Sequence, residues 1–224
     1  MTNKTDRMKI GVIVAMDSEY ERLSSLLGET GRLGDNEIVL RRCGIGKVNS
    51  ALGADALIRE EHPDCIISSG VAGGLAPQVK TLDVVAATST VYHDVWCSMG
   101  CEWGQVQGLP TIFKCAPELV EKVKKASGVL TGTDVHFGLI CSGDQFIESH
   151  EEGRRILSRF PEGLAADMES CSIAQTCYLR GVPFISIRII SDSASDSHFE
   201  EYDNFWGTLA EKSFGCLKTI LEQF

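Results

Sequence analysis

Short apolar runs alternate with longer segments of helical periodicity along most of this chain. The runs rich in Ile, Val and Ala have the length and composition of buried strands, and they cover residues 8–15, 37–43, 65–69, 84–90, 136–141, 163–166 and 183–191. Apolar residues recur at helical spacing in segments 17–27, 46–61, 117–126, 149–159, 170–180 and 202–223. The alternation predicts an α/β protein, a three-layer α/β/α sandwich around a mixed, largely parallel central sheet.

The length of the chain indicates the number of domains, and its composition excludes some classes of partner. The 224 residues suffice for one domain with a sizeable core, so we expect a single domain over 1–224, with 1–7 as a disordered extension. A net charge of −10 argues against a nucleic-acid partner, because binding phosphates needs a basic face. No apolar run approaches the roughly 20 residues that cross a membrane, and no apolar segment of a signal peptide follows the polar start.

The cysteines indicate a reducing compartment. Their number, nine, is odd, and several stand in apolar runs, as free buried thiols do: Cys65, Cys141, Cys171, Cys177 and Cys216. Together with the lack of a membrane segment, this pattern predicts a cytoplasmic protein.

Acidic residues stand where three predicted strands give way to helices. Glu19 follows the first strand, Glu169 follows 163–166, and Asp192 follows 183–191. Each one alone reads most simply as an acid at a helix N-terminus, where the helix dipole favours negative charge. However, the carboxyl ends of parallel strands form the edge where open α/β sheets bind ligands. Three acids at that edge predict one cleft able to perform general-acid and general-base chemistry.

Glycine-rich turns and an aromatic residue follow other strands. The run 69–75 (Ser-Gly-Val-Ala-Gly-Gly-Leu) can bring backbone close to a ligand, but it lacks the spacing of a dinucleotide fingerprint. Residues 44–47 (Gly-Ile-Gly-Lys) resemble the end of a P-loop, except that Val48 replaces the Ser or Thr that reaches the metal. No Gly-x-Ser-x-Gly elbow of a serine hydrolase occurs. Phe146 is either core or a plate for a planar ring.

The long segment 92–109 is rich in Gly, Trp and Cys, and a long irregular loop is more often functional than idle. His93, Cys97 and Cys101 are spaced by four residues there, but no Cys-x-x-Cys pair and no fourth ligand accompany them. We therefore expect no metal and no cofactor.

Seven motifs occur in a fixed order: Met-Lys-Ile-Gly-Val-Ile-x-Ala-Met-x-x-Glu at 8–19, Gly-Ile-Gly-Lys-Val at 44–48, Gly-x-Ala-Gly-Gly-Leu at 70–75, Tyr-His-Asp at 92–94, Ser-Gly-Asp-x-Phe-Ile at 142–147, Met-Glu at 168–169 and Arg-x-Ile-Ser-Asp at 188–192. This series resembles the 5′-methylthioadenosine/S-adenosylhomocysteine nucleosidases. The resemblance implies the nucleoside phosphorylase fold, a homodimer, and cleavage of the N-glycosidic bond of an adenine nucleoside.

The resemblance also implies a role for each site residue. Glu19 is the base that activates water, and Asp192, held by Ser191, is the acid that protonates adenine N7. Glu169 accepts from the ribose hydroxyls, and Arg188 orders Glu19 or its water. For adenine, Phe146 is the expected stacking plate, and Ile147 contacts the edge of the base through its backbone. Met168 lies under the sugar, and Ala72 and Gly73 of the Gly-rich run also contact the substrate. An apolar wall surrounds the 5′ group and consists of Ile45, Trp96, Met99, Phe113 and Tyr202.

The residue types suit hydrolysis. A glycosidic bond breaks through an oxocarbenium-like state, which needs negative charge near the sugar, a proton for the base and water on the opposite face. The family's phosphorylase relatives hold phosphate with arginines, but residues 15–19 contain none, and Glu19 would repel phosphate.

Two positions depart from the family pattern. Val71 stands where many members have a small hydroxyl residue, and 95–100 replaces the usual Asp-x-Thr-x-Phe-Gly of the pocket for the 5′ group. We expect segment 96–103 to lie at the dimer interface and to close the partner's pocket. Futalosine or aminodeoxyfutalosine hydrolase of the same fold, and a non-catalytic sensor of adenine nucleosides, are the alternatives. The ranking of these substrates, the turnover rate and the pathway do not follow from the sequence.

Overall fold

The computed structural model describes residues 7–28, 31–98, 100–193, 202, 204–206 and 210–224. Its strands are β1 (Lys9–Val14), β2 (Arg32–Leu33), β3 (Asn36–Arg42), β4 (Cys65–Gly74), β5 (Val84–Tyr92), β6 (Ile112–Lys114), β7 (Val135–Ser142), β8 (Gly163–Asp167) and β9 (Phe184–Ser193). Its helices are α1 (Asp17–Leu27), α2 (Lys47–Glu61), α3 (Pro117–Ser127), α4 (His150–Arg159), α5 (Ser170–Arg180) and α7 (Ala210–Leu221).

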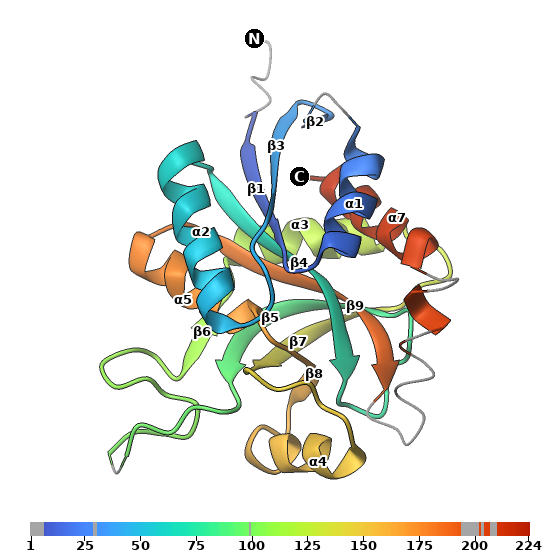
Figure 1. Ribbon diagram of the computed structural model, residues 1–224. Coiled ribbons are helices and arrows are strands. Elements are labelled where there is room, and N and C mark those ends of the chain that lie inside the picture. The colour runs from blue at the N-terminus through green and yellow to red at the C-terminus, as the bar shows by residue number, and fades with distance from the viewer. Residues whose placement is uncertain (1–6, 29–30, 99, 194–201, 203, 207–209) are drawn as a thin grey trace.

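The strands form one mixed sheet whose long pairings are mostly parallel, as the sequence predicts. β3, β1, β4 and β9 lie parallel in that order, and β5, β7 and β8 form a second parallel set. The two sets meet antiparallel, β5 against β9 and the end of β4 against β8. Strands β4, β9, β5, β7 and β8 therefore close into a ring, and this part of the sheet is barrel-like (Figure 1).

Helices cover the sheet on two sides (Figure 1). α2 and α5 pack against each other on one side, while α1, α3 and α7 gather on the other. Helix α4 lies apart from both groups, beyond the ends of β7 and β8. This arrangement leaves the carboxyl ends of β1, β4, β8 and β9 open toward a shared space.

The core explains why the strands could be recognised in the sequence. β1, β4 and β9 are covered on both faces, so nearly every side chain in them is buried, including Ile10, Val12, Ile66, Ile187 and Ile190. A strand of this kind reads as a continuous apolar run and not as an alternation. The predicted strand ranges and the helix ranges up to 180 are confirmed, with boundaries shifted by a few residues.

Two features differ from the prediction, and two predicted segments lie partly outside the described residues. The Gly-rich run was expected to be a turn after a short strand, but residues 70–74 continue β4, hydrogen-bonded to β9. The short strands β2 and β6 were missed, because two or three residues carry too little pattern to be recognised. Of the predicted helix 202–223, α7 is the main described part, and the predicted extension at 1–7 lies, except for Arg7, outside the described residues.

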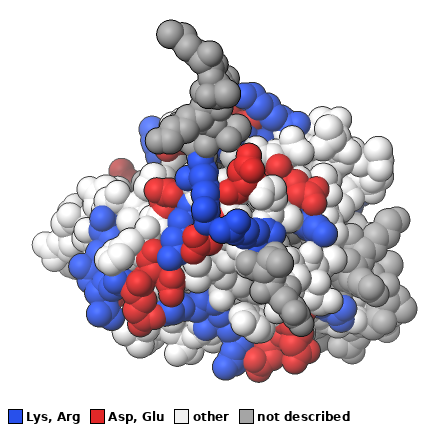
Figure 2. Space-filling view, turned by 90° about the horizontal axis from the view of Figure 1, so that it is seen from above, with Lys and Arg blue, Asp and Glu red and all other residues white. Residues whose placement is uncertain are grey.

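Cysteine burial and surface charge agree in part with expectation. All nine cysteines are free, and Cys65, Cys141, Cys171 and Cys177 are buried, although Cys216 is only partly so. At the end of the molecule where β1 begins, acidic and basic side chains intermingle (Figure 2). Lys9, the first residue of β1, forms an ion pair with Glu61. Within the described ranges, none of the helices combines the length and the apolar character needed to span a bilayer.

Candidate active site

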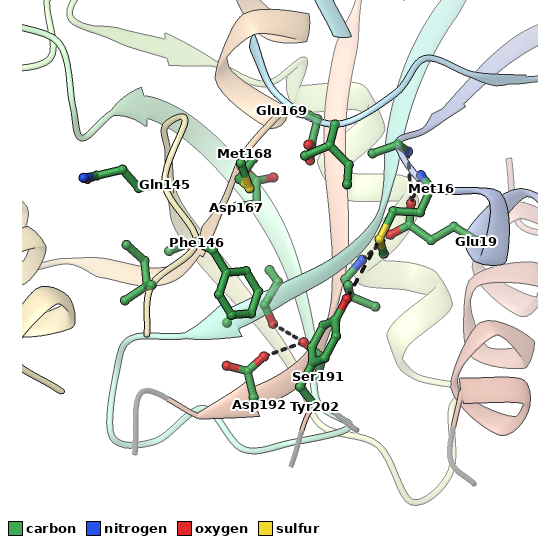
Figure 3. A pocket seen from close by; sticks show the side chains of 17 residues that line it. Met16, Glu19, Gln145, Phe146, Asp167, Met168, Glu169, Ser191, Asp192 and Tyr202 are labelled. Atoms are coloured by element: carbon green, nitrogen blue, oxygen red, sulfur yellow. Dashed lines mark hydrogen bonds between the residues drawn. The ribbon is translucent and has the colours of Figure 1, made fainter. Parts of the chain in front are cut away.

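A pocket of about 650 Å³, counted to its open mouth, lies at the carboxyl ends of the parallel strands (Figure 3). Its lining comes from the ends of β1, β4, β8 and β9 and from the loops that follow β3 and β7: Ala15, Met16, Glu19, Ile45, Val71, Ala72, Gly73, Gln145, Phe146, Ile147, Ala166, Asp167, Met168, Glu169, Ser191, Asp192 and Tyr202. Its mixture of apolar walls and a few charged residues is typical of a small-molecule site.

Glu19 sits in the first turn of α1 with its carboxylate turned back toward the pocket. The N–H groups of Ala15 and Met16 both donate to its Oε2 over 2.9 Å, and the N–H of Val71 donates to Oε1 over 3.0 Å. Three donors from two elements fix the position of this carboxylate. The helix-cap reading of Glu19 is therefore correct locally, but the carboxylate also lines the pocket.

Gly70 makes this position of Glu19 possible. Its φ of +143° is one that side chains rarely allow, and a Cβ atom there would overlap Oε1 of Glu19. The lack of a side chain at Gly70 of β4 thus lets the Glu19 carboxylate lie close to the backbone, whether or not a ligand also approaches there.

Burial raises the pKa of the Glu19 carboxyl above its ordinary value, since the side chain is almost fully shielded from water. The three backbone N–H groups and the positive charge of Arg188 act in the opposite direction. The result is a carboxylate with a raised proton affinity and fixed orientation, which suits a base that removes a proton from water.

Asp192 lies near the end of β9, on the opposite side of the pocket from Glu19 (Figure 3). The hydroxyl of Ser191 lies 2.6 Å from its Oδ1 and 3.4 Å from the carbonyl oxygen of Ala72. The register between β4 and β9 shifts between Ala72 and Gly73, so that Gly73 is the residue paired with Asp192. An irregularity of this kind re-aims a side chain at a strand end.

Glu169 forms a third acidic side of the pocket, directly before α5. The N–H of Gly46 donates to its Oε1 over 2.9 Å. Burial, followed by the neighbouring charge of Asp167, raises the pKa of Glu169 to about 7, against the opposing effects of Arg188 and of the Gly46 N–H. Near neutral pH Glu169 therefore exchanges between its protonated and ionised forms, and the ionised form accepts hydrogen bonds.

Arg188 and Asp167 form a buried ion pair beneath these acids. Nε of Arg188 donates to Oδ2 of Asp167 over 2.7 Å, and Nη2 donates to the hydroxyl of Ser68 over 3.0 Å. Nη2 also lies 3.8 Å from Oε2 of Glu169. The hydrogen bonds of Arg188 thus go to Asp167 and Ser68, and its charge favours the ionised form of Glu19. Its expected role in ordering Glu19 or the water beside it stays a prediction.

Apolar and aromatic side chains complete the walls. The rings of Phe146 and Tyr202 meet edge to face with centroids 5.7 Å apart, and both face the pocket (Figure 3). Met168 lies between Asp167 and Glu169 in the same wall. Because Phe146 is exposed, it fits a surface on which a planar ring stacks better than it fits a core residue.

The structure brings most of the predicted residues together. Those that line the pocket are Glu19, Ile45, Ala72, Gly73, Phe146, Ile147, Met168, Glu169, Ser191, Asp192 and Tyr202. Arg188 lies buried behind the wall. Met99 falls outside the described residues.

Trp96 and Phe113 do not line the pocket of their own chain. Trp96 is exposed and stacks on Trp103 with centroids 5.5 Å apart, and Phe113 is buried edge to face against Tyr92 and Tyr178. Both were expected at the 5′ end of a partner's pocket, so that role stays a prediction.

Sequence reasoning missed other lining residues, chiefly Asp167, Met16, Val71 and Gln145. Asp167 was visible as an acid at a strand end, the same signal that identified Glu169. Among the described residues no group of three His, Cys, Asp or Glu side chains could hold a metal ion, and His93 is buried whereas Cys97 is exposed.

Comparison with known proteins gives consistent results over nearly the whole chain. Residues 9–222 match the family model of the phosphorylase superfamily. A 5′-methylthioadenosine/S-adenosylhomocysteine nucleosidase from Exiguobacterium is 39% identical, over 96% of this chain and 98% of the relative.

Solved structures of similar proteins include a nucleosidase of the same name and a futalosine hydrolase. The Neisseria meningitidis nucleosidase of this type, in complex with methylthio-immucillin-A, superposes with a TM-score of 0.89 at 38% identity, covering 96% of this chain and 99% of that one. A futalosine hydrolase mutant of Helicobacter pylori superposes with a TM-score of 0.88 at 28% identity, covering 96% and 99%.

Proposed function

The chain belongs to the 5′-methylthioadenosine/S-adenosylhomocysteine nucleosidases of the phosphorylase superfamily, and we propose that it hydrolyses the N-glycosidic bond of both nucleosides. Family membership makes it an N-glycosyl hydrolase. The products are adenine and the corresponding 5′-thio-ribose. The alternative with the same fold, futalosine hydrolysis, has a structural neighbour of lower identity.

One observation supports this function above the others: Glu19, Glu169 and Asp192 face one pocket from three sides (Figure 3). An oxocarbenium-like state needs an acid for the leaving base, a base for water and negative charge near the sugar. Three carboxyl groups from three different strand ends supply all three.

The roles follow from what holds each carboxyl group. Glu19, fixed by three backbone donors, removes the proton from the attacking water. Asp192, oriented by Ser191, protonates adenine N7, so that the base leaves as a neutral molecule. Glu169 accepts from the ribose hydroxyls, and Phe146 stacks on adenine next to it.

The charges around the pocket favour water over phosphate as the nucleophile. Among the described residues that line it, four are acidic and none is Lys or Arg. Arg188 is engaged by Asp167 and buried behind them. A phosphate ion entering beside Glu19 would meet like charge in a poorly hydrated site, which is strongly unfavourable.

The protein acts, in this proposal, as a homodimer formed through the side of α2 and α5. Apolar side chains are exposed there: Val48, Leu52, Tyr178 and Leu179. The segment between β5 and β6, which carries Trp96, projects on the same side (Figure 1). Exposed apolar residues clustered in this way are typical of a protein–protein interface.

Two measurements test the dimer. Sedimentation equilibrium should give twice the mass of the chain. Trp96→Ala should change the ratio of activities on substrates that differ at the 5′ group, with adenine recognition intact. A fully active monomer, or an unchanged ratio, would argue against a partner's Trp96 at the pocket.

Location and domain structure complete the proposal. We place the protein in the cytoplasm as a single catalytic domain over 1–224. The free buried thiols support a reducing compartment, and the single sheet that reaches from β1 to β9 supports one domain.

The function is tested by following adenine release from methylthioadenosine, S-adenosylhomocysteine and aminodeoxyfutalosine in parallel. Release from the first two supports the proposal. Release from aminodeoxyfutalosine alone would favour the futalosine-type alternative. Tight binding without release would indicate a sensor.

A further inference from the structure

Three charged residues outside the pocket lining join the two lining loops, after β3 and β7, to the loop that follows β5. Lys47 begins α2, Asp94 follows β5, and Asp144 follows β7. Nζ of Lys47 donates to Oδ2 of Asp94 over 2.8 Å, and the same oxygen accepts from the N–H of Asp144 over 2.9 Å. The N–H of Lys47 donates to Oδ1 of Asp144 over 2.8 Å, which closes the ring of contacts.

This ring of contacts is directly connected to Glu169 on one side of the pocket and to residues 145–147 on the other. Gly46 and Lys47 present consecutive N–H groups, the first to Glu169 over 2.9 Å and the second to Asp144. Asp144 immediately precedes Gln145, Phe146 and Ile147, all of which line the pocket. The sugar-facing acid and the aromatic wall are therefore held by neighbouring peptide groups at one helix N-terminus.

The backbone at Gly46 shows that the approach is specifically built. Its φ of +91° favours glycine, and a Cβ there would lie 2.9 Å from Oδ1 of Asp144. Any other residue would strain the backbone there and displace the Asp144 carboxylate from the N–H of Lys47. Nζ of Lys47 also lies 5.5 Å from the ring centre of Tyr92, so that its position is restricted from that side too.

We propose that Lys47, Asp94 and Asp144 are positioning residues that fix the separation between Glu169 and the wall formed by Phe146 and Ile147. None of the three lines the pocket, so they act through Gly46 and through the backbone of 145–147. The proposal deepens the proposed function, because it says how the gap for the nucleoside is set.

These contacts fix the positions of the pocket loops but add little to the free energy of unfolding. The three side chains are between 17% and 47% exposed, and ion pairs at that exposure add little to the free energy of unfolding. The reaction depends more strongly than the free energy of unfolding on where the binding groups of the pocket lie. A displacement of about 1 Å of such a group can cost up to about a hundredfold in rate. Loss of the network should therefore be measured in affinity and not in melting temperature.

The test compares Lys47→Met with Lys9→Met. Lys9 forms an ion pair of 2.7 Å with Glu61 at the other end of the same helix, far from the pocket, and serves as the matched control. Lys47→Met should raise KM for methylthioadenosine and Kd for adenine about tenfold, with a smaller change in kcat. Lys9→Met should leave all three constants within about twofold, and both variants should melt near the wild-type temperature.

Two further variants separate positioning from general damage. Lys47→Arg should restore most of the affinity. Asp94→Asn should weaken adenine binding in the same way, and the double variant Lys47→Met/Asp94→Asn should be little worse than either single one, because both remove the same network.

Unchanged KM and Kd in Lys47→Met, or equal losses in Lys9→Met, would overturn the inference. So would strictly additive losses in the double variant. If the wild-type protein released no adenine from any nucleoside, the proposed function would fail, while the comparison of adenine Kd values would still decide the role of Lys47.

Discussion

Nε of Arg188 donates to the Asp167 carboxylate over 2.7 Å, and both side chains are almost completely shielded from water. The hydroxyls of Ser142 and Ser170 also donate to Asp167, so this carboxylate is fully engaged. The pair lies under the pocket, where it places one positive charge near two acids that must act on the substrate. The charge of Arg188 lowers the pKa of both Glu19 and Glu169, against the larger effect of their burial.

Removing one member of this pair should destabilise the protein strongly. Asp167→Ala leaves the guanidinium of Arg188 buried without its main partner, which typically costs about 3–5 kcal/mol. Denaturant unfolding of both proteins measures the difference in the free energy of unfolding. A loss below about 1 kcal/mol would mean that Arg188 finds another partner, such as Glu169.

Asp192→Asn should lose turnover far more than binding. An amide can hydrogen-bond adenine N7 but cannot deliver a proton, and general-acid steps contribute about 10²- to 10⁴-fold. Steady-state kcat and the Kd of adenine, measured on the same preparation, separate the two effects. A near-normal kcat would mean that Asp192 is not the general acid.

Glu19→Gln should stop hydrolysis while sparing the affinity for nucleosides, because Glu19 acts on water and not on the substrate. The amide oxygen can still accept from the N–H groups of Ala15 and Met16, and only the hydrogen bond from the N–H of Val71 is lost, so the local fold should persist. Calorimetric binding of an unreactive nucleoside analogue tests this. If affinity fell as steeply as kcat, Glu19 would be a binding residue.

Glu169→Gln should stabilise the protein at alkaline pH while lowering its activity. The pKa of Glu169 rises from 4.5 to about 7 on folding, so the folded state binds this proton more tightly than the unfolded state. Wild-type stability is therefore lost as pH rises from about 4.5 to 7, by up to about 3 kcal/mol. The Gln variant escapes that loss, and its melting temperature should exceed that of the wild type at pH 8 but not at pH 5. An advantage independent of pH would contradict this explanation.

Much of this site could be predicted from the sequence, because its chemistry stands at strand ends. Apolar runs identified β1, β8 and β9 in the sequence. Since the carboxyl ends of parallel strands form one edge of a sheet, the acids there were expected to lie close together. Asp167 was overlooked because its role depends on Arg188, a residue distant in sequence whose direction no local pattern reveals.

Other features escaped for similar reasons. Gly70–Gly74 resembles a turn by composition, yet it extends β4, because Glu19 and the neighbouring β9 require close backbone approach there. The closure of β5 against β9 is a long-range pairing that strand patterns do not encode. The ring formed by Lys47, Asp94 and Asp144 joins three motifs that could each be seen in the sequence, but not their contacts.

The central claim is that water, activated at Glu19, is the nucleophile that cleaves an adenine nucleoside. The most direct measurement is mass spectrometry of the sugar product formed from methylthioadenosine in ¹⁸O-labelled water without phosphate. Hydrolysis predicts stoichiometric release of adenine and one ¹⁸O atom at the anomeric carbon of the methylthioribose. A reaction that proceeds only when phosphate is added, and that yields a sugar 1-phosphate without the label, would contradict the account.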